Sequence, residues 1–225
     1  MTIPVLTIDG PSGAGKGTIS RALAKKLGWH YLDSGAIYRS VAIAVLQQQV
    51  DKLNVTAVTE VAQNLQLEFE CAEELRVLLA GKDISSQLGS EETGSVASTI
   101  AVYPELRAVL LQKQKDFQQA PGLVADGRDM GTVVFPEAPF KVFLTASAMT
   151  RAQRRYKQLI EKGIDVNIDQ ITRDIEERDR RDQQRATAPL IAAEDAVSID
   201  SSNMTITEVM LAIENLIHSR IKVGS

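Results

Sequence analysis

The segment between residues 10 and 18, with the sequence GPSGAGKGT, constrains the fold more than any other part of the chain. A short apolar run at residues 3–8 precedes it, and apolar residues at helical spacing follow it up to Gly28. Glycines let several backbone N–H groups point at one anion, and the following helix N-terminus adds the positive end of its dipole. A strand, a glycine-rich turn and a helix in this order predict a phosphate-binding loop that opens an α/β domain.

We expect this loop to bind ATP through all of its residues, Gly10, Pro11, Ser12, Gly13, Ala14, Gly15, Lys16, Gly17 and Thr18. Lys16 is expected to be catalytic, because its ammonium can offset charge on the β- and γ-phosphates during transfer. An incidental lysine in a glycine-rich turn would not explain the strand, the spacing and the helix together. The general pattern places a magnesium-binding serine or threonine at position 17, which is glycine here. No direct protein ligand to Mg²⁺ is therefore predicted; Thr18 and Asp126 are candidates through bound water.

The order of the predicted elements indicates an α/β fold with a parallel central sheet. Strands are predicted at residues 2–8, 31–32, 122–125, 141–144 and 196–199, and helices at residues 37–49, 92–100, 104–117, 148–162, 168–184 and 205–220. The alternation breaks between residues 54 and 90. One helix-like stretch and two strand-like runs lie there, the runs at residues 67–71 and 76–80, and the turn signal Gly81-Lys82-Asp83 follows the second run. We interpret this region as a small inserted subdomain with antiparallel strands.

At 225 residues, the chain has the length of one domain that carries insertions. Its net charge of -4 disfavours a general nucleic-acid binder, which needs a basic surface to neutralise phosphates. The apolar run near the N-terminus is too short for a membrane span or a secretory signal. A single cysteine cannot form an internal disulfide. We therefore expect a cytoplasmic, monomeric protein whose partners are small molecules, not nucleic acid or membrane.

A second anion site is predicted beside the phosphate loop. Ser34 follows the second strand, either as a helix N-cap or as a hydroxyl that faces an anion, and Arg39 lies one turn further on. Taken alone, these residues would fit a capped helix with a solvated arginine. Arg128 follows a strand of the same predicted sheet, and ligands collect beyond the carboxyl ends of such strands. Asp126 could orient water on Mg²⁺ or hold Arg128, and its position leaves both roles open.

Residues 151–185 are rich in arginine but balanced by acidic residues. Balanced charge of this kind is typical of a solvated helix, and this is our interpretation of Arg151, Arg154 and Arg173. Two charged helices joined across Gly163 could also form a lid that excludes water.

Four segments carry a resemblance to a known family. IDGPSGAGKGT, LDSGAIYR, DGRDMGTVVFP and ERDRRDQQRATAPL resemble, in this order, the bacterial cytidylate kinases, which are P-loop nucleoside monophosphate kinases. The resemblance implies a three-layer P-loop kinase with helices on both faces of a parallel sheet, an inserted NMP-binding subdomain and a short lid. Within a single kinase domain, residues 1–225, the core would comprise residues 1–33, 103–150 and 186–225, the NMP-binding region residues 34–102, and the lid residues 151–185.

The resemblance also implies an activity, which is ATP- and Mg²⁺-dependent phosphorylation of CMP and dCMP to CDP and dCDP in pyrimidine nucleotide metabolism. By the same resemblance the catalytic residues would be Lys16, Arg128, Arg178 and Arg181. The acceptor phosphate would be surrounded by Ser34, Tyr38, Arg39 and Arg128. The cytosine ring would meet Ser98, Arg107 and Asp129, and the pentose would meet Asp182 and Arg185.

The expected base contact of Asp129 is chemically sensible. A carboxylate accepts from the exocyclic amino group of cytosine and repels the carbonyl that uracil has in its place. For Ser98 and Arg107, the residues alone would suggest a helix surface, and only the resemblance assigns them a role. Two alternatives stay open at this point: a kinase of the same fold for another acceptor (UMP, AMP or a small alcohol), and a nucleotide-binding ATPase without an acceptor.

Overall fold

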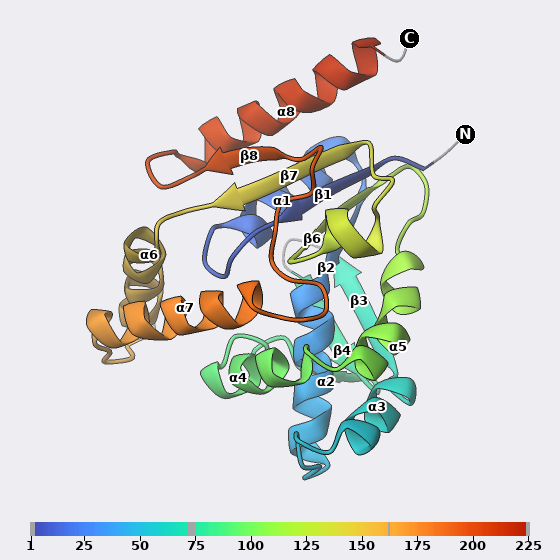
Figure 1. Cartoon of the computed structure of the whole chain (residues 1–225), viewed down its shortest axis with the longest axis vertical. Helices are drawn as coiled ribbons and strands as arrows, with labels where there is room; N and C mark the ends of the chain where they lie inside the picture. Colours follow the sequence, from blue (N-terminus) through green and yellow to red (C-terminus); the bar gives the residue numbers. More distant parts are fainter. Residues whose placement is uncertain (1–2, 72–74, 162, 224–225) are drawn as a thin grey trace. The chain divides into compact units, whose positions relative to one another are not determined.

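The computed structural model describes residues 3–71, 75–161 and 163–223. The chain divides into two compact units, one formed by residues 1–32 and 118–225 and the other by residues 33–117. Figure 1 labels the helices and strands of both units.

The larger unit is built on a five-stranded sheet with the strand order β2-β6-β1-β7-β8. Its strands are β1 (Val5–Asp9), β2 (His30–Asp33), β6 (Leu123–Gly127), β7 (Phe140–Thr145) and β8 (Val197–Asp200). The central strand β1 pairs in parallel with β6 and β7, and β7 pairs in parallel with β8. All five residues of β1 and of β6 are buried, as expected for parallel strands covered on both faces.

The α-helices of this unit, within its described residues, are α1 (Lys16–Leu27), α6 (Ala148–Glu161), α7 (Ile168–Gln183) and α8 (Ile206–Val223). Helix α1 packs against β6 and β1, and α8 packs against α1 and β7. Helices α6 and α7 pack side by side (Figure 1). As predicted, α1 ends at Gly28, which has a φ of 66° in the left-handed region that glycine adopts without strain.

A short π-helix, η1 (Met130–Val134), follows β6 and lies against β1. A Cβ on Gly131 would come within 2.9 Å of Thr7 Oγ1 and 3.4 Å of Asp9 Oδ2, so these two side chains of β1 face η1. Because side chains alternate along a strand, Leu6 and Ile8 point to the opposite face, where both are fully buried. The sequence pattern did not predict η1.

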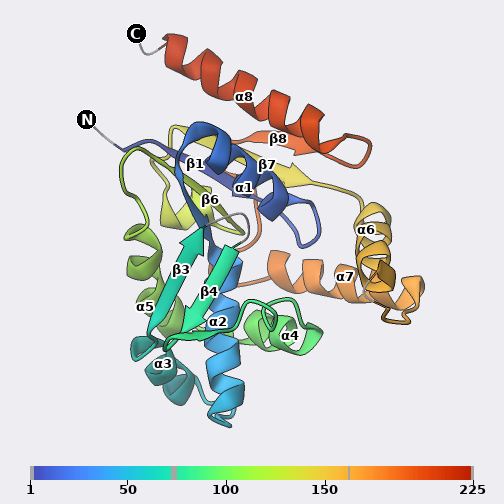
Figure 2. The ribbon, with the colours of Figure 1, turned by 180° about the vertical axis from the view of Figure 1, so that it is seen from behind.

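The smaller unit combines four helices with a separate sheet. The helices are α2 (Ser34–Gln47), α3 (Val55–Gln63), α4 (Glu91–Ile100) and α5 (Pro104–Lys115). The sheet is antiparallel, in the order β3-β4-β5, with β3 (Leu67–Cys71), β4 (Leu75–Leu79) and β5 (Lys82–Asp83) (Figure 2). Val77 of β4 packs with Ile43 of α2 and with Ile84, and this buried cluster fixes the sheet on the helix.

The parallel sheet, its helices and the separate antiparallel sheet confirm the predicted fold class. Besides the π-helix η1, two details differ from the prediction. Lys82 and Asp83 form a third, short strand where only a turn was expected, since Leu79 pairs with Lys82 across the turn. Helix α2 begins at Ser34, three residues earlier than predicted, because Asp33 caps its first turn. None of the helices in the described part of the chain combines the length and apolar character needed to cross a membrane.

Candidate active site

The phosphate loop connects β1 to α1 in the larger unit, as predicted. Gly10 leaves no room for a side chain, because a Cβ there would lie 2.0 Å from the carbonyl oxygen of Leu144 in β7. Gly13 and Gly15 have φ values of 79° and 95°, which residues with a Cβ rarely adopt. The loop can therefore follow this path only with glycine at these positions.

Lys16 is the first residue of α1 and is 7% exposed. Its Nζ donates a hydrogen bond of 2.9 Å to the carbonyl oxygen of Pro11, so the side chain folds back across the loop. The N-cap of α1 is Gly15, which provides no side-chain bond to the first turn. N–H groups at a helix start that lack such a cap, next to a buried ammonium, form a suitable place for a phosphate group.

Asp126 is buried at the end of β6 and accepts a hydrogen bond of 2.7 Å from the hydroxyl of Tyr31. Its Oδ2 lies 3.8 Å from the position that a Cβ on Gly17 would occupy. The carboxylate is therefore held beside the start of α1, where the phosphate loop ends. Thr18, the other candidate for the magnesium site, is exposed.

Asp9 anchors the segment that carries Arg128 and Asp129. This buried carboxylate at the end of β1 accepts the N–H of Met130 at 2.8 Å and the N–H of Gly131 at 2.7 Å. Burial raises the pKa of Asp9 to about 6, against the lowering effect of the two N–H groups. The sequence analysis did not single out Asp9; the one available signal was an acidic residue ending an otherwise apolar strand beside the phosphate loop.

Asp9 leads to a prediction about stability. Its pKa of about 6 in the fold lies above the ordinary value of 3.8, so the folded state binds the proton more tightly than the unfolded state. The free energy that Asp9 contributes to stability is therefore present at pH 4 and is lost as the pH rises through 6. We expect the free energy of unfolding of Asp9→Asn, taken relative to that of the wild type, to be about 2–3 kcal/mol higher at pH 7 than at pH 4. Urea denaturation of both proteins at the two pH values measures this, and parallel pH profiles would contradict it.

A buried charge cluster joins the loop after β6 to helix α7. Arg128 donates through Nε to Asp182 Oδ2 at 2.8 Å, and Arg185 donates to the other oxygen, Oδ1. Burial by itself would raise the pKa of Asp182, but the charges of Arg128, Arg185 and Arg178 outweigh it and hold the pKa below its ordinary range. The structure thus brings together four residues that the sequence analysis assigned to the site. Arg181, which the sequence analysis also assigned to the site, has a side chain that is 47% exposed and lies 3.9 Å from Glu177.

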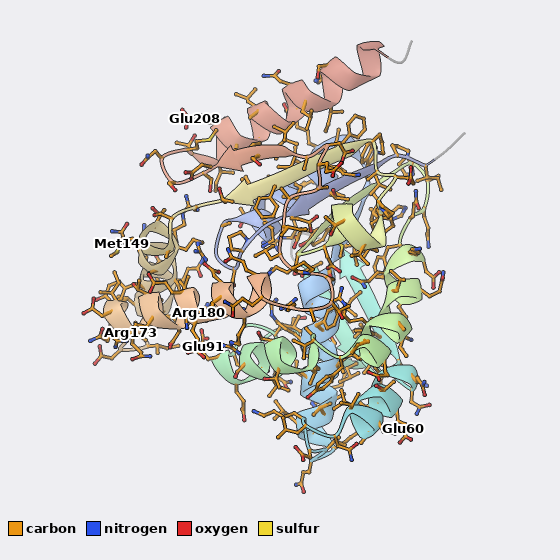
Figure 3. All side chains as sticks on the ribbon, viewed as in Figure 1. Glu60, Glu91, Met149, Arg173, Arg180 and Glu208 are labelled. Carbon is orange, nitrogen blue, oxygen red and sulfur yellow. The ribbon has the colours of Figure 1, made fainter. Side chains whose placement is uncertain are left out.

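The interpretation of two arginines on α6 as solvated was wrong. Arg151 is buried and donates to the carbonyl oxygen of Ser12 in the phosphate loop. Arg154 is half-buried and donates to the carbonyl oxygen of Ser201 at 2.7 Å. Helical charge balance could not show that this side of α6 faces the phosphate loop. Arg173 is exposed on α7, as predicted (Figure 3).

In the smaller unit, Ser34 is buried at the start of α2, but it is not the N-cap. Asp33 takes that position, and its carboxylate accepts the N–H of Ala36 at 2.8 Å. The N-cap alternative for Ser34 was therefore wrong. Its hydroxyl donates to Gln114 Oε1 of α5 at 2.7 Å, and Gln114 is a buried polar residue that the sequence analysis missed.

Four other predicted residues lie in the same unit. The guanidinium carbon of Arg107 lies 5.9 Å from the ring centroid of Tyr38, within the range of a cation–π contact. Ser98 of α4 is buried, and its hydroxyl finds no hydrogen-bond partner among the described residues. Arg39 is half-buried, and its Nη2 lies 3.5 Å from the position that a Cβ on Gly35 would occupy. The hydroxyls of Thr7, Ser20 and Thr132 are in the same state as that of Ser98, so this observation by itself does not assign a role to Ser98.

Comparison with known proteins identifies the family to which the chain belongs. The family model for cytidylate kinase matches residues 6–219, which is nearly the whole chain. The chain belongs to the cytidylate kinase family. It is therefore an enzyme, a nucleotide-binding kinase.

Relatives within the cytidylate kinase family are similar along their whole length. The cytidylate kinase of Methylococcus capsulatus is 56% identical over 218 residues, which cover 97% of this chain and 98% of the relative. That of Aeromonas salmonicida is 56% identical over 211 residues, which cover 93% and 92%. Among solved structures, a gluconokinase from Sinorhizobium meliloti 1021 covers 99% of this chain and 95% of its own at 14% identity, with a TM-score of 0.47. The last likeness is too weak to carry an argument about function.

Proposed function

We propose that the chain transfers the γ-phosphoryl group of ATP to CMP and dCMP, giving ADP with CDP or dCDP. The observation that carries this proposal is the match of residues 6–219 to the cytidylate kinases. The phosphate loop with its buried Lys16 supports the donor side of the reaction. The charge cluster around Asp182 supports the acceptor side, because it holds Arg128 and Arg185 in fixed positions.

On the donor side, residues 10–18 would surround the phosphates of ATP. The N–H groups at the start of α1 would bind phosphate oxygens, and Lys16 would leave the Pro11 carbonyl to follow the charge on the γ-phosphate. Mg²⁺ prefers near-octahedral oxygen ligands, retains several waters, and uses one or two carboxylates together with substrate phosphates. The Asp126 carboxylate beside Gly17 fits such a site, in which it would hold bound water. When bound, the metal would neutralise charge on the transferred phosphoryl group.

On the acceptor side, the roles of the residues follow from their chemistry. Arg39 and Arg128 would bind the phosphate of the monophosphate, together with Ser34 and Tyr38. Ser98 and Asp129 would read the cytosine ring with Arg107, and the unpartnered hydroxyl of Ser98 is the structural observation that supports this role. Asp182 and Arg185 would contact the pentose. Arg178, whose charge acts on Asp182, and Arg181 would flank the phosphoryl group in transfer.

The proposed mechanism needs no general base. The nucleophile is a phosphate oxygen of the acceptor, and the second pKa of a phosphate monoester is about 6, so the group is mostly ionised at neutral pH. Catalysis then rests on in-line positioning and on cancelling charge with Lys16, Mg²⁺ and the arginines. Residues 151–185 would act as a lid. Closing it would exclude water, which otherwise competes with the acceptor.

An ADP-release assay with ATP, Mg²⁺ and one acceptor at a time tests the proposal. Strong turnover with CMP and dCMP and weak turnover with UMP, AMP and GMP is the expected result. Equal turnover with UMP would keep the kinase and remove the cytosine-reading argument. ATP hydrolysis that no monophosphate affects would contradict the proposal and favour an ATPase.

Replacing Asp129 with asparagine tests the base contact. The amide can donate to uracil as well as accept from cytosine, so the ratio of kcat/KM for CMP to that for UMP is expected to fall about 10- to 100-fold. Glu137→Gln is the matched control, because Glu137 is an exposed carboxylate a few residues further along the same segment. An unchanged ratio in Asp129→Asn would remove Asp129 from base recognition.

A further inference from the structure

Arg151 of α6 is a charged side chain that is 4% exposed. Its guanidinium contacts three separate parts of the larger unit. It donates from Nε to the carbonyl oxygen of Ala146 at 2.9 Å, from Nη1 to the carbonyl oxygen of Ser12 at 3.0 Å, and from Nη1 and Nη2 to both carboxylate oxygens of Asp179. Burying a cation costs free energy unless it is paired and hydrogen-bonded, and here the planar fork of arginine satisfies several partners at once.

The contact with Ser12 fixes part of the phosphate loop. The carbonyl of Ser12 and the N–H of Gly13 belong to the same planar peptide group and point in opposite directions. An oxygen that is held by Arg151 therefore directs the Gly13 N–H away from α6. The stem of Arg151 adds a steric constraint, since its Cβ lies 3.3 Å from where a Cβ on Gly13 would be.

A second carbonyl of the loop, that of Ala14, lies near a hydroxyl from another part of the chain. The hydroxyl of Ser201, which follows β8, is 3.2 Å from the carbonyl oxygen of Ala14 and 3.0 Å from that of Thr145, and its single proton serves one of them at a time. Arg154 donates to the carbonyl oxygen of Ser201 at 2.7 Å. Arg151, in contrast, holds the loop carbonyl of Ser12 by a direct charged contact. Backbone N–H groups that are to bind phosphate have to be oriented before the ligand arrives if binding is not to include the cost of ordering them.

The contact with Asp179 orients Arg151 in turn. The two side chains form a bidentate pair, with a shortest distance of 2.5 Å between Nη2 and Oδ2. Asp179 lies on α7, three residues before Asp182, so the two carboxylates share one side of the helix. Asp182 holds Arg128 and Arg185. Helix α7 therefore carries two ion pairs on one side, Asp179 with Arg151, which bonds the phosphate loop, and Asp182 with Arg128.

We infer that Arg151 is a positioning residue for ATP binding: it fixes the backbone of the phosphate loop through the Ser12 carbonyl, and Asp179 keeps it in place. Arg151 needs no contact with the nucleotide for this role. The inference rests on the proposed function, because it takes the loop to be the ATP site.

Calorimetric titration with ATP alone, and separately with CMP alone, tests the inference on Arg151→Lys. Lysine keeps the positive charge but cannot bond Ser12 and both oxygens of Asp179 together. The Kd for ATP is expected to rise at least tenfold, and the Kd for CMP to stay within about twofold of the wild type. Arg173→Lys is the matched control on the neighbouring helix, since Arg173 is exposed and bonds Gln170, and both of its Kd values are expected to be unchanged.

Asp179→Asn tests the action of Asp179 through Arg151. Its Kd for ATP is expected to rise about three- to tenfold, because asparagine keeps one acceptor and loses the charge. If Asp179 acts through Arg151, the double variant will bind ATP no worse than Arg151→Lys alone, within about twofold. If the Kd for ATP of the double variant rises by the product of the two single-variant factors, the link between the two residues is overturned.

Two results would overturn the role of Arg151. One is a Kd for ATP in Arg151→Lys within twofold of the wild type. The other is an equal rise in the Kd values for ATP and CMP, which indicates a general structural defect and not a local effect on the loop. ATP binding is measured without an acceptor, so failure of the wild type to phosphorylate CMP would overturn the proposed function separately.

Discussion

Replacing Lys16 with alanine is expected to lower kcat by about 10²- to 10³-fold at saturating ATP and CMP. Lys16 is the only cation within residues 10–18, and its buried ammonium is held 2.9 Å from the Pro11 carbonyl at the start of α1. In a dry site of this kind, an ammonium stabilises the migrating negative charge far more than it would in water. Steady-state ADP release under matched conditions measures the loss.

The fold is expected to survive this substitution, because alanine is the best helix former and the hydrogen bond from Lys16 to the Pro11 carbonyl stays within the phosphate loop. Lys25→Ala is the matched control, since Lys25 is exposed on the same helix, and its kcat is expected to equal that of the wild type. Near-normal turnover in Lys16→Ala would remove Lys16 from the catalytic machinery. Urea denaturation of both variants shows whether a loss of activity is a loss of fold.

The features that the sequence predicted well are those encoded locally. The phosphate loop requires glycine at fixed positions, and a Cβ on Gly10 would indeed collide with Leu144. Strand β1 is a short, fully buried run that contains Val5 and Ile8, and α1 and α5 show apolar residues at helical spacing with Gly28 and Pro104 at their ends. Such signals act within a few residues, so they can be read without knowing which segments meet.

The features that the sequence could not predict are contacts between distant residues. Asp9 bonds Met130 and Gly131, more than 120 residues away, and Arg151 bonds Ser12 across 139 residues. An arginine in a charge-balanced helix has the same local pattern whether it is solvated or buried, because the pattern does not contain its partner. Only the tertiary packing of α6 reveals which of its arginines are buried.

Ser98 shows where resemblance and structure each contribute. Its helical surroundings alone would suggest an ordinary surface serine, and the resemblance to the cytidylate kinases was what singled it out. The structure adds that the hydroxyl is buried and has no hydrogen-bond partner in the described part of the chain. A buried polar atom left in this state costs stability, but Thr7, Ser20 and Thr132 share it, so the role of Ser98 still rests on the resemblance.

Replacing Asp182 with alanine is expected to lower the free energy of unfolding by about 3–5 kcal/mol at pH 7. Asp182 is 1% exposed and is the shared carboxylate of Arg128 and Arg185, so its removal leaves two partly buried guanidinium groups without that partner. Its pKa is held below the ordinary range, which means that its stabilising effect is present at neutral pH and is lost as the pH falls through that pKa. Urea denaturation at pH 7 measures the change.

A double-mutant cycle separates this pair from a general loss of packing. If Arg128 and Asp182 stabilise each other, Arg128→Met combined with Asp182→Ala will destabilise the fold by less than the sum of the single variants, with a coupling of about 1–3 kcal/mol. Glu176→Ala is the control on the same helix, because Glu176 is exposed and its removal is expected to change stability by no more than about 0.5 kcal/mol. Additive effects would show that the cluster does not hold Arg128 in place. The acceptor site would then lack the preorganised arginine on which the proposed mechanism depends.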